Sequence, residues 1–313
     1  MQSFQYVRHG KEEILIDFIC KRFPYHTREK WLENINNAFL TITNNKVSPQ
    51  TILINKDVTS YERPRSDEPE IDTNYQILFQ DEFILVVIKN SNIPVSESGK
   101  YYKNTLINIL KENENIKELF AVHRLDKETS GLLVIAKNKE IATVLGKQFS
   151  NQQTEKIYHA ILLGNIQADE LIVDKPLKKA TEEQSKIRIR QAVLDGGKQS
   201  KTIFYPLTSD INLTLCKIKT LTGRTHQIRC HAEFIGHPIL GDKLYGQSDD
   251  FFLDILKGKN KPIFKPYGIL KRQLLHASSL TFNHPSTNEK VNFQADYKDE
   301  FSKYSFLKDL LTK

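Results

Sequence analysis

From Tyr75 onward the chain is a succession of short, strongly apolar segments separated by turns and interrupted by few helical patterns. Segments of this length that are rich in β-branched and aromatic residues are typical of strands. Because they follow one another without regular alternation with helices, the pattern predicts an α+β fold with a mixed, mostly antiparallel central sheet flanked by helices. The predicted strands are YQILFQ (75–80), FILVVIK (83–89), LLVIAK (132–137), KIYHAILLG (156–164), TIFYPLT (202–208) and NLTLCKIKT (212–220), and the predicted helices cover 102–118 and 139–150.

The N-terminal part of the chain predicts a separate, smaller α+β module over 1–60. A first helical pattern is followed by Thr27, which is placed to cap a second helix over 28–35. The segments 38–44 and 51–56 then have the character of two short strands around a turn. Two helices and a strand pair in so short a stretch indicate a small domain of its own.

The segment YERPRSDEPEIDTN (61–74) differs from the sequence on either side of it. It is rich in proline and acidic residues and has no apolar period, which is typical of an exposed linker. The sequence therefore predicts a small module over 1–60, a linker over 61–74 and a large domain over 75–313.

Composition narrows the classes of protein to which the chain can belong. With 39% hydrophobic and 27% charged residues, it has the composition of a soluble globular protein, and its apolar runs fall far short of the ~20 residues needed to span a bilayer. The N-terminus lacks the pattern of a secretory signal, and the 3 cysteines form no C-x-x-C pair, so we expect a cytoplasmic protein without disulfides. The net charge of +7 is compatible with a polyanionic partner such as RNA.

The first polar segment of interest is AVHRLDKETSGLLVIAK (121–137), in which Asp126 precedes a buried strand. A carboxylate held at the end of a strand by a hydroxyl-rich turn is suited to nucleophilic or base chemistry. The alternative is that Asp126 only accepts hydrogen bonds from Thr129 or Ser130 in an Asx-type turn. The spacing alone leaves both interpretations open.

The second segment is LTGRTHQIRCHAEFIGHPILGDKLYG (221–246). Thr225 is placed to cap a helix that Gly236 can end, and on this helix His226 and Arg229 share a face that is not the apolar one. Arg229 can therefore point into a site, or it can simply pair with Glu233 at the surface.

The sequence contains no established cofactor or metal motif. There is no P-loop, no dinucleotide-binding glycine pattern, no H-E-x-x-H and no G-x-S-x-G, so we expect neither a cofactor nor a metal. Tyr158, in the strand EKIYHAILLG, is a third candidate residue, although a tyrosine in a strand usually packs in the core.

Taken together and in this order, these segments resemble the RluA family of RNA pseudouridine synthases. HRLDKETSG (123–131) matches the family signature, and LTGRTHQIRCHAEFIGHPILGDKLYG matches a later family block. KIYHAILLG corresponds to the Lys-x-Tyr-x-Ala strand and LLHASSLTFNHP (274–285) to the C-terminal element, so that the resemblance covers roughly 75–295. It implies the pseudouridine synthase fold and an isomerase that converts uridine in structured RNA to pseudouridine.

The resemblance also implies roles for individual residues. Asp126 would be the catalytic carboxylate, Arg229 its ion-pair partner, and Tyr158 the ring that stacks on uracil. A uridine inside folded RNA must flip out to be reached, and Arg124 would help to hold the flipped state. The substrate contacts that the resemblance implies are His123, Arg124, Thr129, Arg224, His226, Gln227 and Leu240.

The N-terminal module is similar to a small RNA-binding domain shared with a ribosomal protein, except that Asn36 and Asn37 stand where a turn glycine is usual. This similarity favours rRNA as the substrate, with tRNA possible, and the family resemblance implies a monomer. Two other classes remain to be considered. A non-catalytic RNA-binding or ribosome-assembly factor could keep the same fold, whereas a hydrolase that uses Asp and His fits the composition but not the motifs.

Overall fold

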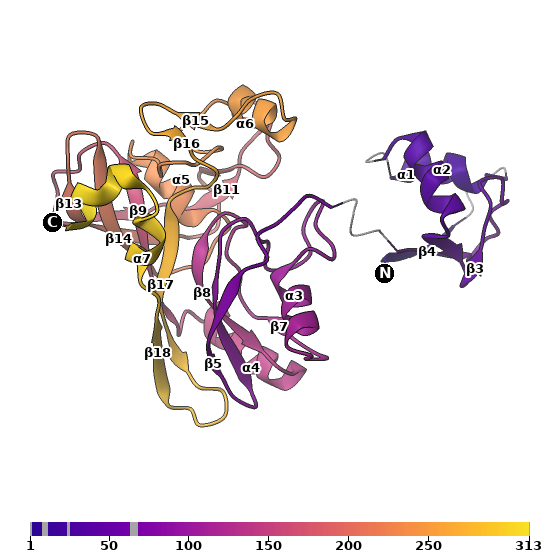
Figure 1. Cartoon of the computed structure of the whole chain (residues 1–313), viewed down its shortest axis with the longest axis horizontal. Coiled ribbons are helices and arrows are strands. Elements are labelled where there is room, and N and C mark those ends of the chain that lie inside the picture. The colour runs from indigo at the N-terminus through magenta and orange to yellow at the C-terminus, as the bar shows by residue number, and fades with distance from the viewer. Residues whose placement is uncertain (1, 8–11, 24–25, 63–67, 313) are drawn as a thin grey trace. The chain divides into compact units, whose positions relative to one another are not determined.

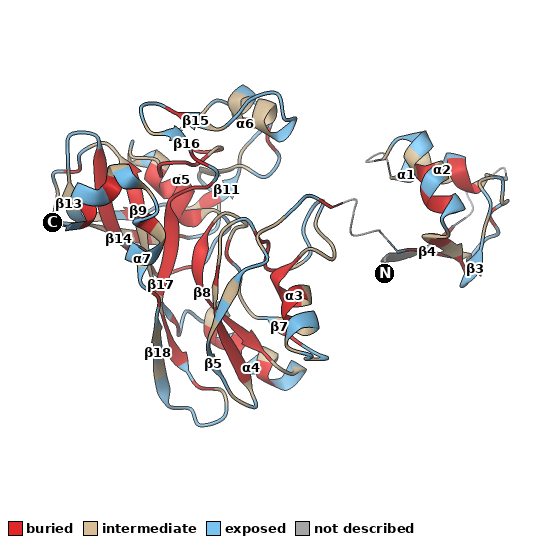
Figure 2. Cartoon of the chain, in the orientation of Figure 1, coloured by how far each residue is buried: buried red, intermediate tan, exposed pale blue. Residues whose placement is uncertain are grey.

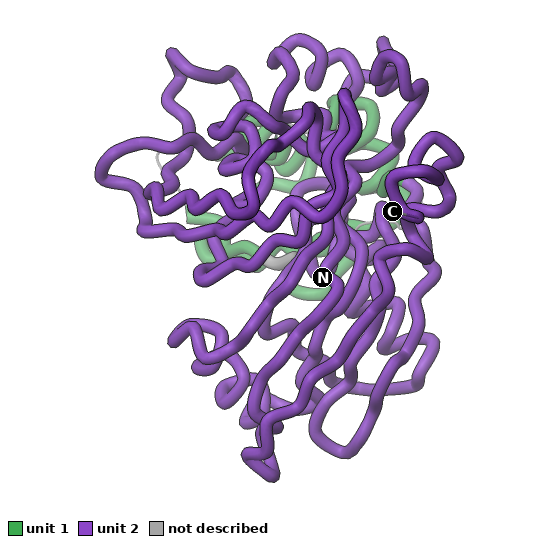
Figure 3. Tube along the Cα trace, turned by 90° about the vertical axis from the view of Figure 1, so that its left-hand side faces the viewer, with its two compact units in different colours: residues 1–69 green, residues 70–313 purple. Residues whose placement is uncertain are grey.

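The computed structural model describes residues 2–7, 12–23, 26–62 and 68–312, and the chain divides into two compact units, 1–69 and 70–313 (Figure 3). Of the expected linker, 63–67 lie outside the described residues. Tyr61, which we expected at its start, is instead a buried residue at the end of a strand of the first unit.

The first unit encloses its own apolar core around Trp31, whose ring contacts that of Tyr61 with centroids 5.0 Å apart. Thr27 accepts a hydrogen bond from the backbone of Lys30 and so caps the second helix, as predicted. The strand expected over 51–56 is wrong, because the chain turns there before it enters the sheet. The elements are β1 (Gln2–Gln5), α1 (Leu15–Arg22), α2 (Arg28–Asn36), β2 (Leu40–Ile42), β3 (Asn45–Lys46) and β4 (Val58–Tyr61), with sheet order β1-β4-β2-β3.

The second unit is built on a 10-stranded sheet in which β17 pairs in parallel with β8, whereas the other strand pairs of this sheet, within the described residues, are antiparallel (Figure 1). This confirms the predicted α+β class. The order of neighbouring strands across the sheet is β10-β13-β14-β9-β17-β8-β6-β5, and β18 and β7 pair with β17 and β8 outside this order. The strands are β5 (Tyr75–Gln80), β6 (Ile84–Lys89), β7 (Phe120–Ala121), β8 (Ser130–Ala136), β9 (Glu155–Leu163), β10 (Leu171–Asp174), β13 (Lys201–Ser209), β14 (Leu213–Thr220), β17 (Leu275–Asn283) and β18 (Lys290–Gln294).

Helices and two small strand pairs complete this unit. The helices are α3 (Leu106–Asn113), α4 (Lys139–Ser150), α5 (Gln227–Phe234), α6 (Asp249–Leu256), α7 (Tyr297–Phe301), a 3-10 turn (Ser305–Leu307) and α8 (Lys308–Thr312). The small pairs are β11 (Leu177–Lys179) with β12 (Gln191–Val193), and β15 (Ile263–Phe264) with β16 (Gly268–Ile269).

The strands β6 and β8 are buried on both faces, which explains why their sequences are apolar without alternation (Figure 2). Leu85 and Val87 pack in a cluster with α3, whereas Ile84 and Val86, which point the other way, pack in a cluster with α4. In the other half of the sheet, α5 packs on one face of β9 and the C-terminal helices on the opposite face.

The two halves of the sheet meet at a short parallel contact in which Ser130 and Gly131 of β8 pair with His276 and Ala277 of β17. Gly131 has φ +111°, and a Cβ at this position would lie 2.2 Å from the carbonyl oxygen of Ala277. Only glycine lets the two backbones approach this closely. The glycine that ends HRLDKETSG is therefore required by the junction of the half-sheets, directly behind the loop that carries Asp126.

Candidate active site

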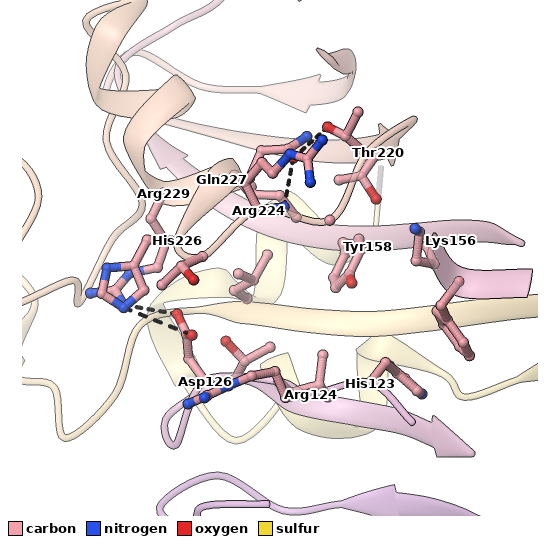
Figure 4. Close-up of a pocket in the computed structure, with 18 of the residues that line it drawn as sticks. His123, Arg124, Asp126, Lys156, Tyr158, Thr220, Arg224, His226, Gln227 and Arg229 are labelled. Atoms are coloured by element: carbon pink, nitrogen blue, oxygen red, sulfur yellow. Dashed lines mark hydrogen bonds and ion pairs between the residues drawn. The ribbon is translucent and has the colours of Figure 1, made fainter. Parts of the chain in front are cut away.

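A cavity of about 400 Å³ opens where the loop before β8, the strand β9, the end of β14 and the start of α5 come together (Figure 4). This volume lies within the range of small-molecule sites. Segments far apart in the sequence thus contribute to one cavity. The lining residues labelled in Figure 4 are His123, Arg124, Asp126, Lys156, Tyr158, Thr220, Arg224, His226, Gln227 and Arg229.

Asp126 belongs to a loop that is held on both sides of it. The side chain of Asp126 is 23% exposed and is free of the Asx-type turn considered above, since Ser130 pairs with His276 and the backbone N–H of Thr129 donates to the backbone carbonyl of Asp126. That alternative is therefore wrong. The anchors of the loop are Val134 N–H to His123 Nε2 (3.1 Å), Gln273 Nε2 to Thr129 Oγ1 (2.8 Å) and Lys89 Nζ to the carbonyl of Lys127 (3.0 Å).

Arg229, on α5, binds the loop because its guanidinium donates hydrogen bonds to two carboxylates at once. Its Nη1 donates to Asp126 at 2.8 Å, while Nε and Nη2 form a two-point contact with Asp242 at 2.6 and 2.9 Å. The planar guanidinium suits such a fork. The surface pairing with Glu233 is wrong, because Glu233 pairs with Arg190 at 2.6 Å.

This arrangement keeps Asp126 ionised. Burial alone raises the pKa of Asp126, but its basic neighbours, first Arg229 and then His226 and Arg124, together outweigh this effect, and the pKa lies below its ordinary value. Burial likewise opposes the charge of Arg229, yet Asp242 and then Asp126 hold the pKa of Arg229 well above its ordinary value. The pair is therefore a carboxylate and a guanidinium at neutral pH.

His226, rather than Thr225, is the residue that precedes α5, and it has φ +55° and makes no side-chain cap. Its Nδ1 lies 3.0 Å from the hydroxyl of Tyr245, which already accepts the backbone N–H of Gln191. The other ring nitrogen, Nε2, lies 3.9 Å from Oδ1 of Asp126. Burial and then Arg229 lower the pKa of His226 to about 4, so the ring is neutral at pH 7.

Tyr158 lies on β9 with its ring against two apolar clusters, one associated with α3 and one with α5, and it also lines the cavity. Packing in the core and a place in the site are therefore not exclusive for this residue. Burial, and then the charge of Asp126, raise the pKa of Tyr158, so the hydroxyl is protonated across the physiological range.

The remaining predicted residues have different surroundings. The guanidinium of Arg124 is exposed at the cavity and pairs with no residue of the described ranges, and that of Arg224 is exposed and donates to the carbonyl of Gln199. Gln227 lines the cavity, but its amide is bonded within the protein, to Thr222 among others. It therefore organises the loop before α5.

The prediction that Leu240 contacts the substrate is wrong, because Leu240 does not line the cavity. The residue is 0% exposed and packs with Ile161 and Phe301 on the other side of β9. Its backbone bonds Ile161 and Leu274, which places it between strands and not beside a ligand.

Asp242, Tyr245 and Lys156 were assigned no function from the sequence. All three nevertheless lie inside the candidate segments GDKLYG and EKIYHAILLG. An acidic residue between apolar segments was a signal for Asp242, but its partner Arg229 is identified only by the three-dimensional contact.

Two features are absent from the described part of the chain. Within 2–7, 12–23, 26–62 and 68–312, no cluster of His, Cys, Asp and Glu has the make-up of a metal site. None of the helices in those ranges is both long and apolar enough to cross a membrane.

The comparison with known proteins points to one family. The family model described as RNA pseudouridylate synthase matches residues 83–234. The chain is 35% identical over 245 residues to the ribosomal large subunit pseudouridine synthase D of Zymomonas mobilis, covering 75% of this chain and 72% of that protein. It is 32% identical over 225 residues to the dual-specificity RNA pseudouridine synthase RluA of Vibrio vulnificus, covering 70% of this chain and 82% of that protein.

A yeast relative and a solved structure agree with this assignment. The mitochondrial tRNA pseudouridine(32) synthase of Saccharomyces cerevisiae is 31% identical over 248 residues, which are 79% of this chain but only 54% of the yeast protein. The structure titled human RNA pseudouridylate synthase domain containing 1 superimposes with a TM-score of 0.56 at 26% identity, covering 73% of this chain and 86% of that one. The resemblance seen in the sequence is thereby confirmed, and the chain belongs to the RluA family of RNA pseudouridine synthases.

Proposed function

We propose that this chain converts uridine to pseudouridine in rRNA or tRNA, with Asp126 as the catalytic carboxylate. The observation that carries the proposal is the ion pair of Asp126 with Arg229 at the edge of a cavity that Tyr158 also lines. The relatives named above act on large-subunit rRNA and on tRNA, which supports an RNA substrate.

The reaction breaks the bond between N1 of uracil and C1′ of ribose, turns the base and joins C5 to C1′; C5 loses a proton and N1 gains one, so the product is an isomer of the substrate. No electron acceptor or group donor enters this balance. The carboxylate of Asp126 can attack the sugar or the base, or remove a ribose proton, and each of these steps requires its ionised form. Arg229 supplies that form by holding the pKa of Asp126 low despite burial.

The target uridine must leave its helix to enter the cavity, at a cost of a few kcal/mol. We assign Tyr158 to contact the flipped base, since its ring lines the cavity and its apolar face is held by two core clusters. Arg124, exposed at the cavity, is placed to contact the RNA from which the base has moved.

Tritium release from RNA labelled at C5 of uridine tests the proposal, with separate rRNA and tRNA pools. We expect the wild-type chain to release tritium from at least one pool, and Asp126→Asn to lose more than about 99% of the rate while still binding RNA. Retention of more than about one-hundredth of the rate by Asp126→Asn contradicts the role of Asp126. RNA binding by the wild type without tritium release from either pool favours the non-catalytic assembly factor.

Some expectations from the sequence stay predictions. They are the preference for rRNA, RNA binding by the N-terminal unit, the monomeric state and the cytoplasmic location. The yeast relative is named as mitochondrial.

A further inference from the structure

Lys156 is a buried cation in the cavity for which the reaction described above has no use. It lies on β9 two residues before Tyr158, is 8% exposed, and lines the cavity together with Thr220 and Gly223 (Figure 4). No residue of the described ranges accepts a hydrogen bond from its ammonium group or forms an ion pair with it. Burial lowers the pKa of Lys156, and no acidic neighbour counteracts this.

Two other lysines that are largely buried in the same unit have hydrogen-bond partners. Lys89 donates to three backbone carbonyls at 2.9 to 3.0 Å, and Lys243 donates to Glu128 and to the carbonyl of Lys271, both at 2.6 Å. A buried charge without such partners costs free energy. The ammonium of Lys156 instead faces the cavity, where a ligand can bind it without displacing a protein partner among the described residues.

We infer that Lys156 binds a phosphodiester group of the RNA strand that carries the target uridine; the inference rests on the function proposed above. Lys156 and Tyr158 point to the same face of β9 and their Cα atoms are about 6.6 Å apart along the strand. A base on Tyr158 thus places the adjoining backbone of its own strand near Lys156. Figure 4 shows Lys156 beyond Tyr158 as seen from Asp126, away from the reacting groups.

The surroundings of Lys156 favour a phosphate over a neutral group. The neighbouring Gly223 has no side chain, and a Cβ built there would lie 4.0 Å from Nζ of Lys156, so no side chain covers the ammonium at this position. The exposed guanidinium of Arg224 lines the same cavity and adds positive charge. A compact ammonium is a common phosphate ligand in proteins.

The variant Lys156→Met separates this role from a structural one, because only a structural role predicts a loss of stability. Since the ammonium has no partner among the described residues, its removal should not lower the melting temperature of the free protein. The same change should weaken binding of total tRNA or deproteinised rRNA on the order of tenfold. It should also reduce the slope of log affinity against log salt by about 0.7, the value for one single-stranded phosphate. Fluorescence titration of the full chain over a salt series measures both RNA effects.

Two further variants serve as controls. Lys156→Arg keeps the charge and should retain the wild-type salt slope. Lys217→Met removes an exposed lysine on β14 that pairs with His159 and so faces away from Tyr158, and it should change neither stability nor RNA binding.

A lower melting temperature of Lys156→Met with unchanged RNA affinity overturns the inference and makes Lys156 structural. Weaker binding with an unchanged salt slope also overturns it, since the contact would then be with an uncharged group. If the wild-type chain neither binds nor modifies either RNA pool, the proposed function itself fails and this inference fails with it.

Discussion

At the scale of single residues, Arg229 is the side chain on which the charge state of the site depends. Its guanidinium serves Asp126 and Asp242 simultaneously through separate nitrogen atoms. Lysine carries the same charge but lacks the rigid fork. In Arg229→Lys, we therefore expect the ammonium to stay with the fully buried Asp242 and Asp126 to lose its charged hydrogen bond.

Because burial alone raises the pKa of Asp126, loss of this hydrogen bond should move the acidic limb of the pH profile of kcat/KM to higher pH. A rate loss on the order of 100-fold should accompany it, as misplacement by ~1 Å typically causes. Arg28→Lys, the same exchange in the exposed pair with Asp17, is the matched control and should leave the profile unchanged. An acidic limb that stays in place in Arg229→Lys contradicts the role of the ion pair.

At the scale of elements, the parallel contact between β8 and β17 holds the two halves of the sheet together directly behind the loop of Asp126. Gly131→Ala would place a Cβ against the carbonyl oxygen of Ala277 at φ +111°. We expect this variant to lose at least about 2 kcal/mol of unfolding free energy, from strain and from separation of the strands. Urea unfolding followed by circular dichroism measures the loss.

Gly146→Ala is the matched control for this prediction. Gly146 lies within α4, and a Cβ there would meet nothing within 4 Å. Alanine favours a helix over glycine by up to about 1 kcal/mol, so this variant should be at least as stable as the wild type. Equal stability of both variants would mean that the contact between the half-sheets tolerates a side chain.

At the scale of the whole molecule, neutral histidines inside the fold predict that stability depends on pH. Burial lowers the pKa of His123 and His276 to about 3 and that of His159 and His226 to about 4. Contacts agree with the neutral form, since Nε2 of His123 accepts the backbone N–H of Val134.

The ordinary pKa of histidine is about 6.5, so between about pH 6.5 and pH 4 the unfolded chain binds more protons than the folded one. The unfolding free energy should therefore fall as the pH drops through this window, by up to about 1.4 kcal/mol per pH unit for each residue. The lowered pKa of Asp126 acts in the same direction at still lower pH. Urea unfolding at a series of pH values checks this, and an unfolding free energy that stays constant down to about pH 5 would contradict it.

Much of the fold was predictable because its causes are local. The helix over 139–150 has the predicted bounds, since Asn138 caps it and its apolar residues recur at helical spacing. The strands of the large domain were recognisable from apolar runs, and the hairpin of β13 and β14 from the turn between them. The strand expected over 51–56 failed because short apolar segments can also run through turns.

The candidate site was predictable only in part. The segments with Asp126, Tyr158 and Arg229 were singled out by their polar residues between apolar elements and by their resemblance to a family, and all three residues line one cavity. Leu240 was placed wrongly, because an apolar residue near a site has the same sequence signal as one in the adjoining core.

The sequence by itself determined the α+β class, most elements of the large domain, the family and the segments whose residues line the cavity. Local periodicity and turn residues are sufficient for the class and the elements, and the resemblance of the motifs indicated the family. Only the tertiary structure decided that Arg229 pairs with Asp126 and Asp242 instead of Glu233, that the hydroxyl of Tyr245 lies against Nδ1 of His226, and that Lys156 pairs with no residue among those the structure describes. These features depend on contacts between residues distant in the chain, and each arises because burial makes a polar group either find a partner or stay uncompensated.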